Sequence, residues 1–223
     1  MSYYSARGSS SARRLLSLAF LRQLNYNAHI VFRTVGRKRM KPWEHFKTIT
    51  THRILVMRAC FKMGLYRQGL THDLSKYSPV EFWTGARYYQ GVRSPNAAER
   101  EDKGYSEAWM HHKGRNRHHY EYWTDMDPKT RVYESVPMPR RYLAEMVADR
   151  LAACKVYEGE NFTNESPLRY LMRSREKNLM NPQTRQELEF LLTMLRDRGE
   201  KETFRYIRKE ILKGTPFPWE EKS

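Results

Sequence analysis

Histidine is concentrated in one part of this 223-residue sequence. Seven of its eight histidines lie between residues 45 and 119, and four of these form the adjacent pairs His111-His112 and His118-His119. Imidazole is the commonest side-chain ligand for transition-metal ions. Such a density of histidine is not expected by chance, so this region is predicted to hold a metal site.

Carboxylates at two further places could complete that site. His72-Asp73 places a nitrogen ligand beside an oxygen ligand, and the two oxygens of Asp73 can bridge two cations. Asp149 lies on a predicted helix, with Glu145 one turn before it and small alanines one turn after. A buried carboxylate needs a cation or hydrogen-bond donors. Asp149 is therefore interpreted as a metal ligand, with an ion pair to Arg150 or another arginine as the alternative.

The order of these residues resembles that of the HD-domain metal-dependent phosphohydrolases, in which a histidine precedes a His-Asp doublet and a final aspartate. The resemblance implies an all-α bundle whose ligands project into its centre. Residues 72–76 (HDLSK) also resemble the HDxxK variant of the branch that binds two or more metals. That branch's glycine-tyrosine-proline signature is absent, so its cyclic-dinucleotide specificity is not carried over. The ligands that the resemblance implies are His52, His72, Asp73, His112, His118, His119 and Asp149.

Longer segments resemble a bacterial family of uncharacterised function. They are HDLSKYSPVEF, SPNAAERE, GYSEAWMHHKGRNRHHYEYW and MPRRYLAEMVADRLAACKVY, and the similarity runs from about Pro42 to Lys213. This resemblance implies that the histidine-rich core is the shared part and that residues 1–41 are an addition. It implies no substrate.

The implied ligands predict the hydrolysis of a phosphoester. A metal-bound water becomes a hydroxide nucleophile near neutral pH, because its pKa falls from 15.7 to about 7 in good zinc sites. One or two divalent ions of Mn, Fe, Co, Ni or Zn would hold this hydroxide in line with phosphorus and neutralise the phosphoryl oxygens. The expected substrate is a nucleotide or another small phosphorylated molecule.

The candidate catalytic residues are Asp73, Lys76 and Glu145. Lys76 lies one turn beyond Asp73 and could contact the phosphate or the leaving oxygen, with a salt bridge to Glu81 or another carboxylate as the alternative. Glu81 and Glu145 are candidate general acids, or carboxylates that orient a ligand imidazole.

The segment between the two histidine pairs could bind the substrate. Its candidate phosphate contacts are Arg115, Asn116 and Arg117, with a polar turn that faces solvent as the alternative. Aromatic residues flank the same histidines and could stack a nucleobase or shield the site as core residues. These aromatic residues are Trp109, Tyr120, Tyr122 and Trp123, and the core interpretation is favoured for the two tryptophans.

Helices are predicted to position all of these residues. Ser78-Pro79 is typical of a helix start, and Gly64 is expected to end the preceding helix. Residues 91–105 and 124–139 are predicted to be loops, and no convincing pair of strands is found. The fold class is therefore predicted to be all-α. Apolar spacing predicts helices over residues 43–66, 79–90, 106–112, 140–157, 164–175 and 182–212, with a break at Gly199.

Composition narrows the function classes. Hydrophobic residues make up 39% of the chain, enough for a core, and the net charge of +16 favours an anionic partner. There is no GxGxxG, GxxxxGK[ST] or GxSxG motif, which argues against common nucleotide-binding folds and serine hydrolases. Two cysteines without a CxxC motif favour a reducing, cytoplasmic location. No apolar run is long enough to predict a membrane span.

The chain is predicted to divide into a basic extension (residues 1–41), a metal-binding domain (42–214) and a C-terminal tail (215–223). The extension contains nine Lys or Arg and no Asp or Glu, and its leucines recur at near-helical spacing. It could pack on its own domain, bind nucleic acid or an anionic membrane surface, or act as an organellar targeting segment.

Two other function classes stay open. A basic nucleic-acid-binding protein could use the histidines as a structural metal site, and its binding would depend steeply on salt. A non-haem di-metal oxygenase or redox protein could use the same ligand types, and its metal identity and visible absorption would differ from those of a hydrolase. The sequence does not determine the oligomeric state.

Overall fold

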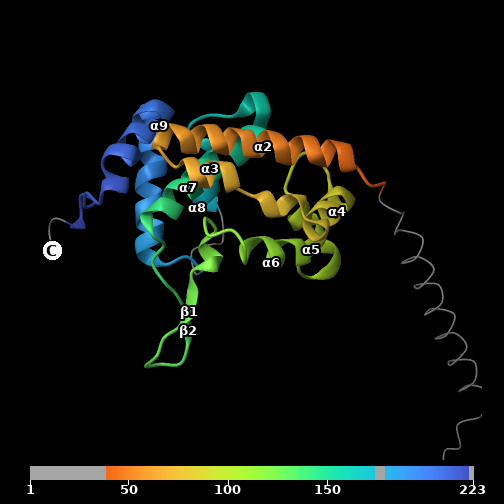
Figure 1. Cartoon of the computed structure of the whole chain (residues 1–223), viewed down its shortest axis with the longest axis horizontal. Helices are drawn as coiled ribbons and strands as arrows, with labels where there is room; N and C mark the ends of the chain where they lie inside the picture. Colours follow the sequence, from red (N-terminus) through yellow and green to blue (C-terminus); the bar gives the residue numbers. More distant parts are fainter. Residues whose placement is uncertain (1–38, 174–178, 221–223) are drawn as a thin grey trace, which may run out of the picture. The chain divides into compact units, whose positions relative to one another are not determined.

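The computed structural model describes residues 39–173 and 179–220. Within these residues the chain is mostly helical, which confirms the predicted all-α class, and a two-stranded hairpin is the exception (Figure 1). The described residues from Met40 onward belong to one compact unit. Most of the predicted extension, residues 1–38, lies outside the described residues.

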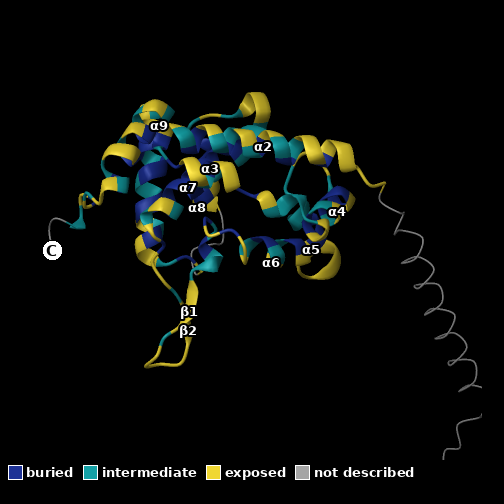
Figure 2. Ribbon diagram, viewed as in Figure 1, coloured by how far each residue is buried: buried dark blue, intermediate teal, exposed yellow. Residues whose placement is uncertain are grey.

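Two long helices form the centre of the bundle. α2 (Pro42–Met63) packs along α7 (Arg140–Glu158), and α9 (Pro182–Lys209) packs against both. α2 ends at Gly64, as predicted, with a φ of 83° that glycine adopts without a steric cost. α9 contains the predicted break at Gly199, where φ is 75°. The fully buried side chains of this core include Val56, Cys60, Leu143, Val147, Leu188, Leu191, Leu192 and Leu195. Figure 2 colours the buried parts of the ribbon dark blue.

Short helices pack along α2, with α3 at its C-terminal end and α4 at its N-terminal end. α3 (Tyr66–Thr71) is followed by the 3-10 turn η1 (Leu74–Tyr77) and then by α4 (Pro79–Tyr88). Pro79 begins α4 as predicted, but the Ser78 hydroxyl makes no capping hydrogen bond. Asp73, between α3 and η1, has a φ of 52°, a left-handed conformation that is uncommon for a residue other than glycine. This turn directs residues 72 and 73 toward the interior.

Residues 91–105, predicted to be a loop, contain the helix α5 (Pro95–Lys103). Its start repeats the Ser-Pro pattern of α4, and Gly104 ends it in the left-handed conformation. The prediction failed because the nine-residue helix is highly charged and two alanines are its only apolar residues apart from proline. α6 (Glu107–Lys113) follows, and the Ser106 side chain caps it by accepting a hydrogen bond from the Trp109 amide.

Residues 124–139, also predicted to be a loop, contain the hairpin. A 3-10 turn, η2 (Tyr120–Tyr122), leads into β1 (Thr124–Met126), which pairs antiparallel with β2 (Tyr133–Ser135). Asp125 lies opposite Glu134 in this register. The strands project away from the helices and are largely exposed, so they lack the buried alternating face that predicts a strand (Figure 1).

The C-terminal part closes the core. A 3-10 turn, η3 (Gly159–Asn161), leads to α8 (Ser166–Arg173), and the turn η5 (Ile211–Lys213) follows α9. Residues 215–220 belong to the folded unit instead of forming a tail, since Phe217 is fully buried and its ring stacks on Trp219. Among the described helices, none is long and apolar enough to cross a membrane.

Candidate metal centre

Four segments that are distant in the sequence bring the seven predicted ligands together. α2 contributes His52, the turn before η1 contributes His72 and Asp73, and α7 contributes Asp149. The segment from α6 to η2 contributes the remaining histidines, His112, His118 and His119. His52 faces inward because it lies on the buried stripe of α2, one turn before Val56.

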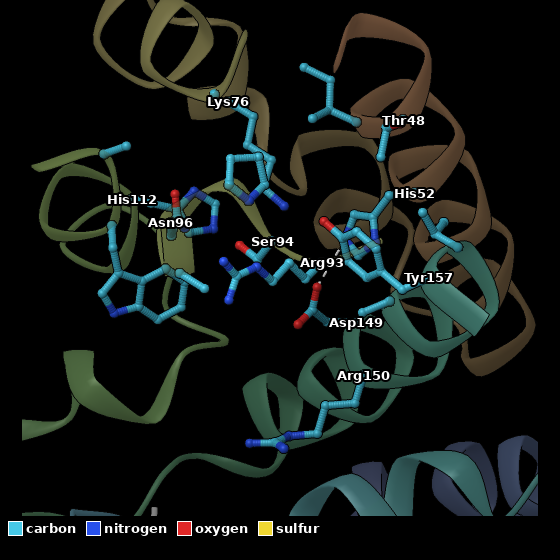
Figure 3. Close-up of a pocket in the computed structure, with 18 of the residues that line it drawn as sticks. Thr48, His52, Lys76, Arg93, Ser94, Asn96, His112, Asp149, Arg150 and Tyr157 are labelled. Carbon is cyan, nitrogen blue, oxygen red and sulfur yellow. Dashed lines mark ion pairs between the residues drawn. The ribbon is translucent and has the colours of Figure 1, made fainter. Parts of the chain in front are cut away.

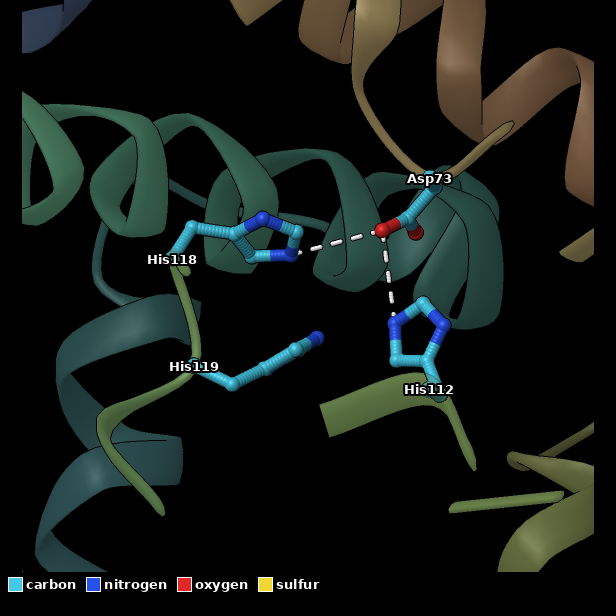
Figure 4. A group of neighbouring side chains, drawn as sticks. All are labelled: Asp73, His112, His118 and His119. Carbon is cyan, nitrogen blue, oxygen red and sulfur yellow. Dashed lines mark ion pairs between the residues drawn. The ribbon is translucent and has the colours of Figure 1, made fainter. Parts of the chain in front are cut away.

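Asp73 lies between two groups of histidines. Its Oδ2 is 3.4 Å from Nε2 of His72 and 3.7 Å from Nε2 of His52. Its Oδ1 is 3.3 Å from Nε2 of His112 and 3.4 Å from Nε2 of His118 (Figure 4). The carboxylate, which is only 1% exposed, therefore presents one oxygen to each group.

Each group has the donor set of a metal site. The ligand atoms within a group lie within 4.8 Å of one another, and Asp73 is shared. Mixed imidazole and carboxylate donors suit divalent transition metals. The first group is His52, His72, Asp73 and Asp149, and the second is Asp73, His112, His118 and His119. These side chains could hold two metal ions bridged by Asp73.

The inward-facing atoms of these side chains are buried without hydrogen bonds. Among the residues that the structure describes, both oxygens of Asp73 and the Nε2 atoms of four histidines have no hydrogen-bond partner, and two of these six atoms have a close ion-pair contact instead. Oδ2 of Asp73 pairs with Lys76, and Nε2 of His52 lies 3.0 Å from Oδ1 of Asp149. Buried polar atoms are nearly always satisfied by protein, water or an ion. These six atoms therefore fit a bound cation. The four histidines are His52, His72, His118 and His119.

Two buried glutamates hold the outer nitrogens of the imidazoles. Oε1 of Glu145 is 2.9 Å from Nδ1 of His72 and 3.2 Å from Nδ1 of His118. Oε2 of Glu81 is 2.7 Å from Nδ1 of His112. An N–H that donates to a carboxylate from Nδ1 leaves the lone pair of Nε2 free for a metal. Because Glu145 holds both imidazoles, its carboxylate forms a further group of possible metal ligands with His72 and His118.

His111 points elsewhere. Its Nδ1 lies 2.6 Å from Oε1 of Glu81, the same carboxylate that holds His112, and it joins neither metal group. The two histidines of the first pair therefore have different roles. Nδ1 of each contacts Glu81, but only His112 also reaches Asp73 through Nε2. His112 faces Asp73, whereas His111 helps to hold Glu81.

The electrostatics of the site are dominated by buried carboxylates. Burial by itself would lower the pKa of His72, but Asp73, Asp149 and Glu145 raise it to about 10. Burial would raise the pKa values of Asp73 and Asp149, yet neighbouring imidazoles hold both well below the usual range, and Lys76 adds to this effect at Asp73. The carboxylates stay ionised, so the site requires balancing positive charge.

A cavity of about 630 Å³ opens beside the metal groups. His52, His112 and Asp149 form one part of its wall, and Lys76, whose Nζ is 2.6 Å from Oδ2 of Asp73, reaches the same space (Figure 3). Other lining residues come from the segment between α4 and α5 and from α7. They include Arg93, Ser94, Asn96, Arg150 and Tyr157.

Comparison with known proteins identifies the family but not an activity. Residues 41–194 match the model of DUF5662, a family of unknown function. The chain belongs to this family. The match covers all seven predicted ligands, Lys76, and both orienting glutamates. No curated protein and no solved structure matches the chain.

The family's matched region includes the predicted substrate contacts, but these do not line the cavity. The exposed Arg115 donates to the His111 carbonyl, and Arg117 lies over the Tyr122 ring. Asn116 is buried, and its amide donates to the His112 carbonyl. Arg115 and Asn116 are therefore engaged with the first histidine pair at the end of α6, and Arg117 with the turn that follows the second pair.

Cations that sequence reasoning missed line the cavity instead. Arg93 and Arg100 come from the predicted loop that contains α5. Arg150 follows Asp149 on α7, and the sequence suggested it only as an ion-pair partner of Asp149, not as a cavity residue. No local pattern marked them, because their placement depends on how α5 and α7 pack around the site. Trp109 also lines the cavity, where its ring contacts His112 and His119, whereas Trp123 packs against the core.

Proposed function

We propose that this chain is a metal-dependent hydrolase of small phosphoesters, of the HD-domain type. The observation that supports this most strongly is the position of Asp73, with one oxygen toward each histidine group, beside a cavity that also contains a lysine. The donor atoms and the unsatisfied buried nitrogens fit divalent ions. Such ions, when bound, activate water and neutralise phosphoryl oxygens.

The chain's own residues bind and orient the substrate. Lys76 would contact a phosphate oxygen, because it lines the cavity. Its ammonium pairs with Asp73, which corresponds to the salt-bridge alternative, so the phosphate contact would be made in addition to that ion pair. Arg150 adds positive charge to the same walls and favours the capture of an anion. Arg93 also lines the cavity, but its guanidinium forms a bidentate ion pair with Glu101. A small phosphorylated molecule, such as a nucleotide, fits both the size and the charge of this space.

Glu145 acts as a positioning residue in this proposal, although the sequence left a role as general acid open. Its carboxylate contacts the outer nitrogens of His72 and His118 and does not line the cavity. Glu81 does line the cavity, but both of its oxygens contact histidines. Both glutamates therefore hold imidazole tautomers that leave Nε2 available to a metal.

The test is phosphate release from a panel of nucleotides and small phosphoesters by the metal-replete chain. Lys76→Ala should lower kcat about 100-fold, as expected when one charged contact to the transition state is lost, while metal content stays unchanged. The matched control is Lys103→Ala, because Lys103 forms an ion pair with Glu99 away from the cavity. This control should keep full activity.

Failure would distinguish the alternatives. If no substrate releases phosphate with Mn, Fe, Co, Ni, Mg or Zn, the hydrolase proposal is wrong. A visible absorption band from bound iron would then favour the redox function. Binding of nucleic acid that survives metal removal would instead favour the basic binding protein. Equal activity of Lys76→Ala and the wild type would reject only the proposed role of Lys76 and would leave the hydrolase proposal standing.

A further inference from the structure

A second buried histidine of α2 lines the same cavity and belongs to neither metal group. His45 is 6% exposed, and among the described residues its Nδ1 has no hydrogen-bond partner. It precedes His52 by seven residues, which is two helical turns or about 10 Å along the axis. The cavity therefore extends along α2 from the metal groups to His45, with Ile49 between them.

The imidazole of His45 is held against a glycine of α4. A Cβ atom at Gly85 would lie only 2.2 Å from Nε2 of His45, so the ring occupies the space that any larger residue would need. The rings of Phe82 and Tyr89 flank it, with centroids 5.5 and 6.0 Å away. The ring is thus fixed by its surroundings without a hydrogen bond to Nδ1.

The chemistry of this end differs from that of the metal end. Burial, together with the charge of Lys76, lowers the pKa of His45 to about 4. A neutral imidazole offers one N–H donor and one acceptor nitrogen. The neighbouring Thr48 hydroxyl is already engaged, since it donates to the Glu44 carbonyl and lies 2.7 Å from the Tyr89 hydroxyl. His45 therefore has hydrogen-bonding capacity to spare at this end of the cavity, whereas Thr48 does not.

We infer that His45 is a substrate-binding residue, which selects phosphoesters whose organic part carries an uncharged hydrogen-bonding group, such as a hydroxyl, at the end away from the phosphate. This inference rests on the proposed function, because it assumes that the phosphate lies at the metal groups. The apolar wall at Ile49 would contact the carbon skeleton between the two ends.

Binding of alkylphosphonates to the metal-loaded full-length chain tests the inference without requiring turnover. Each ω-hydroxyalkylphosphonate is compared by calorimetry with the plain alkylphosphonate of equal length, over a series of increasing chain lengths. Once the alkyl chain of the ligand is long enough for its end to reach His45, the hydroxyl should improve the binding affinity about threefold to tenfold, the usual value of one hydrogen bond. His45→Ala should abolish this preference and leave the binding of short phosphonates unchanged.

Thr48→Val is the matched control, because Thr48 lines the same end of the cavity but its hydroxyl is already engaged. This variant should retain the hydroxyl preference. The inference is overturned if alkylphosphonates bind without any hydroxyl preference, or if the preference survives His45→Ala. If no alkylphosphonate binds to the metal-loaded chain, the phosphoester function itself is wrong, and the inference about His45 fails with it.

Discussion

Glu145 and His72 form the contact on which the geometry of the first metal group depends. Oε1 of Glu145 lies 2.9 Å from Nδ1 of His72, and the opposite ring nitrogen lies 3.4 Å from Oδ2 of Asp73. The imidazole is thus held between a carboxylate that orients it and a carboxylate that would share its metal. Glu145 also contacts His118 of the other group, so one glutamate supports both groups.

Replacing Glu145 should weaken metal binding without removing a ligand. Glu145→Gln retains an acceptor oxygen but loses the charge that strengthens the imidazole ligands, so metal affinity should fall about 10-fold to 100-fold. Competition with a chelator measures this change. Glu187→Gln is the control, since Glu187 is equally buried but contacts Gln183 on α9. Equal affinities in the two variants would contradict the orienting role.

Metal content should depend on which group a substitution removes. Asp73→Ala should lose both ions, because Asp73 contributes an oxygen to each group. His52→Ala and His119→Ala should each lose mainly one ion. Elemental analysis measures the content, and the thermal midpoint should fall with it because metal binding energy is also folding energy. Full occupancy in Asp73→Ala would show that Asp73 does not bridge the groups.

The stability of the metal-free chain should fall as the pH rises above neutrality. The pKa of His72 is raised from 6.5 to about 10, so its protonation stabilises the fold fully below pH 6.5. This stabilisation is lost progressively as the pH rises to about 10. Bound metal should reduce this pH dependence of stability, because an imidazole that ligates a metal is already unprotonated. Thermal unfolding with and without metal is the measurement, and a flat profile for the metal-free chain would contradict this prediction.

A methyl group at Gly85 should strain the contact with His45. Gly85→Ala should destabilise the fold by about 1–3 kcal/mol, since the new Cβ would lie 2.2 Å from Nε2 of His45. Combining it with His45→Ala should recover part of that loss, because the smaller side chain removes the clash. Denaturant unfolding of both single variants and the double variant forms a complete cycle. Additive losses would show that the two residues do not compete for the same space.

The sequence predicted the main helices and the ligand types because both depend on local features. Apolar spacing predicted α2, α7 and α9, and the His72-Asp73 doublet identified where ligands could gather. Local patterns failed for α5 and for the β1–β2 hairpin. α5 is a short, highly charged helix with two alanines as its only apolar residues apart from proline, and the two strands are largely exposed. Neither element therefore has a face of large, buried apolar side chains.

Only the tertiary structure decided how the ligands divide into groups and what surrounds them. The placement of Asp73 between four histidines requires α2, α6 and α7 to converge on one turn with an unusual backbone conformation. The cavity walls likewise combine His45, Arg93 and Arg150 from different helices and loops. The spacing of residues in the sequence indicates which of them share one helical face. Contacts between separate elements depend instead on how their buried side chains pack together.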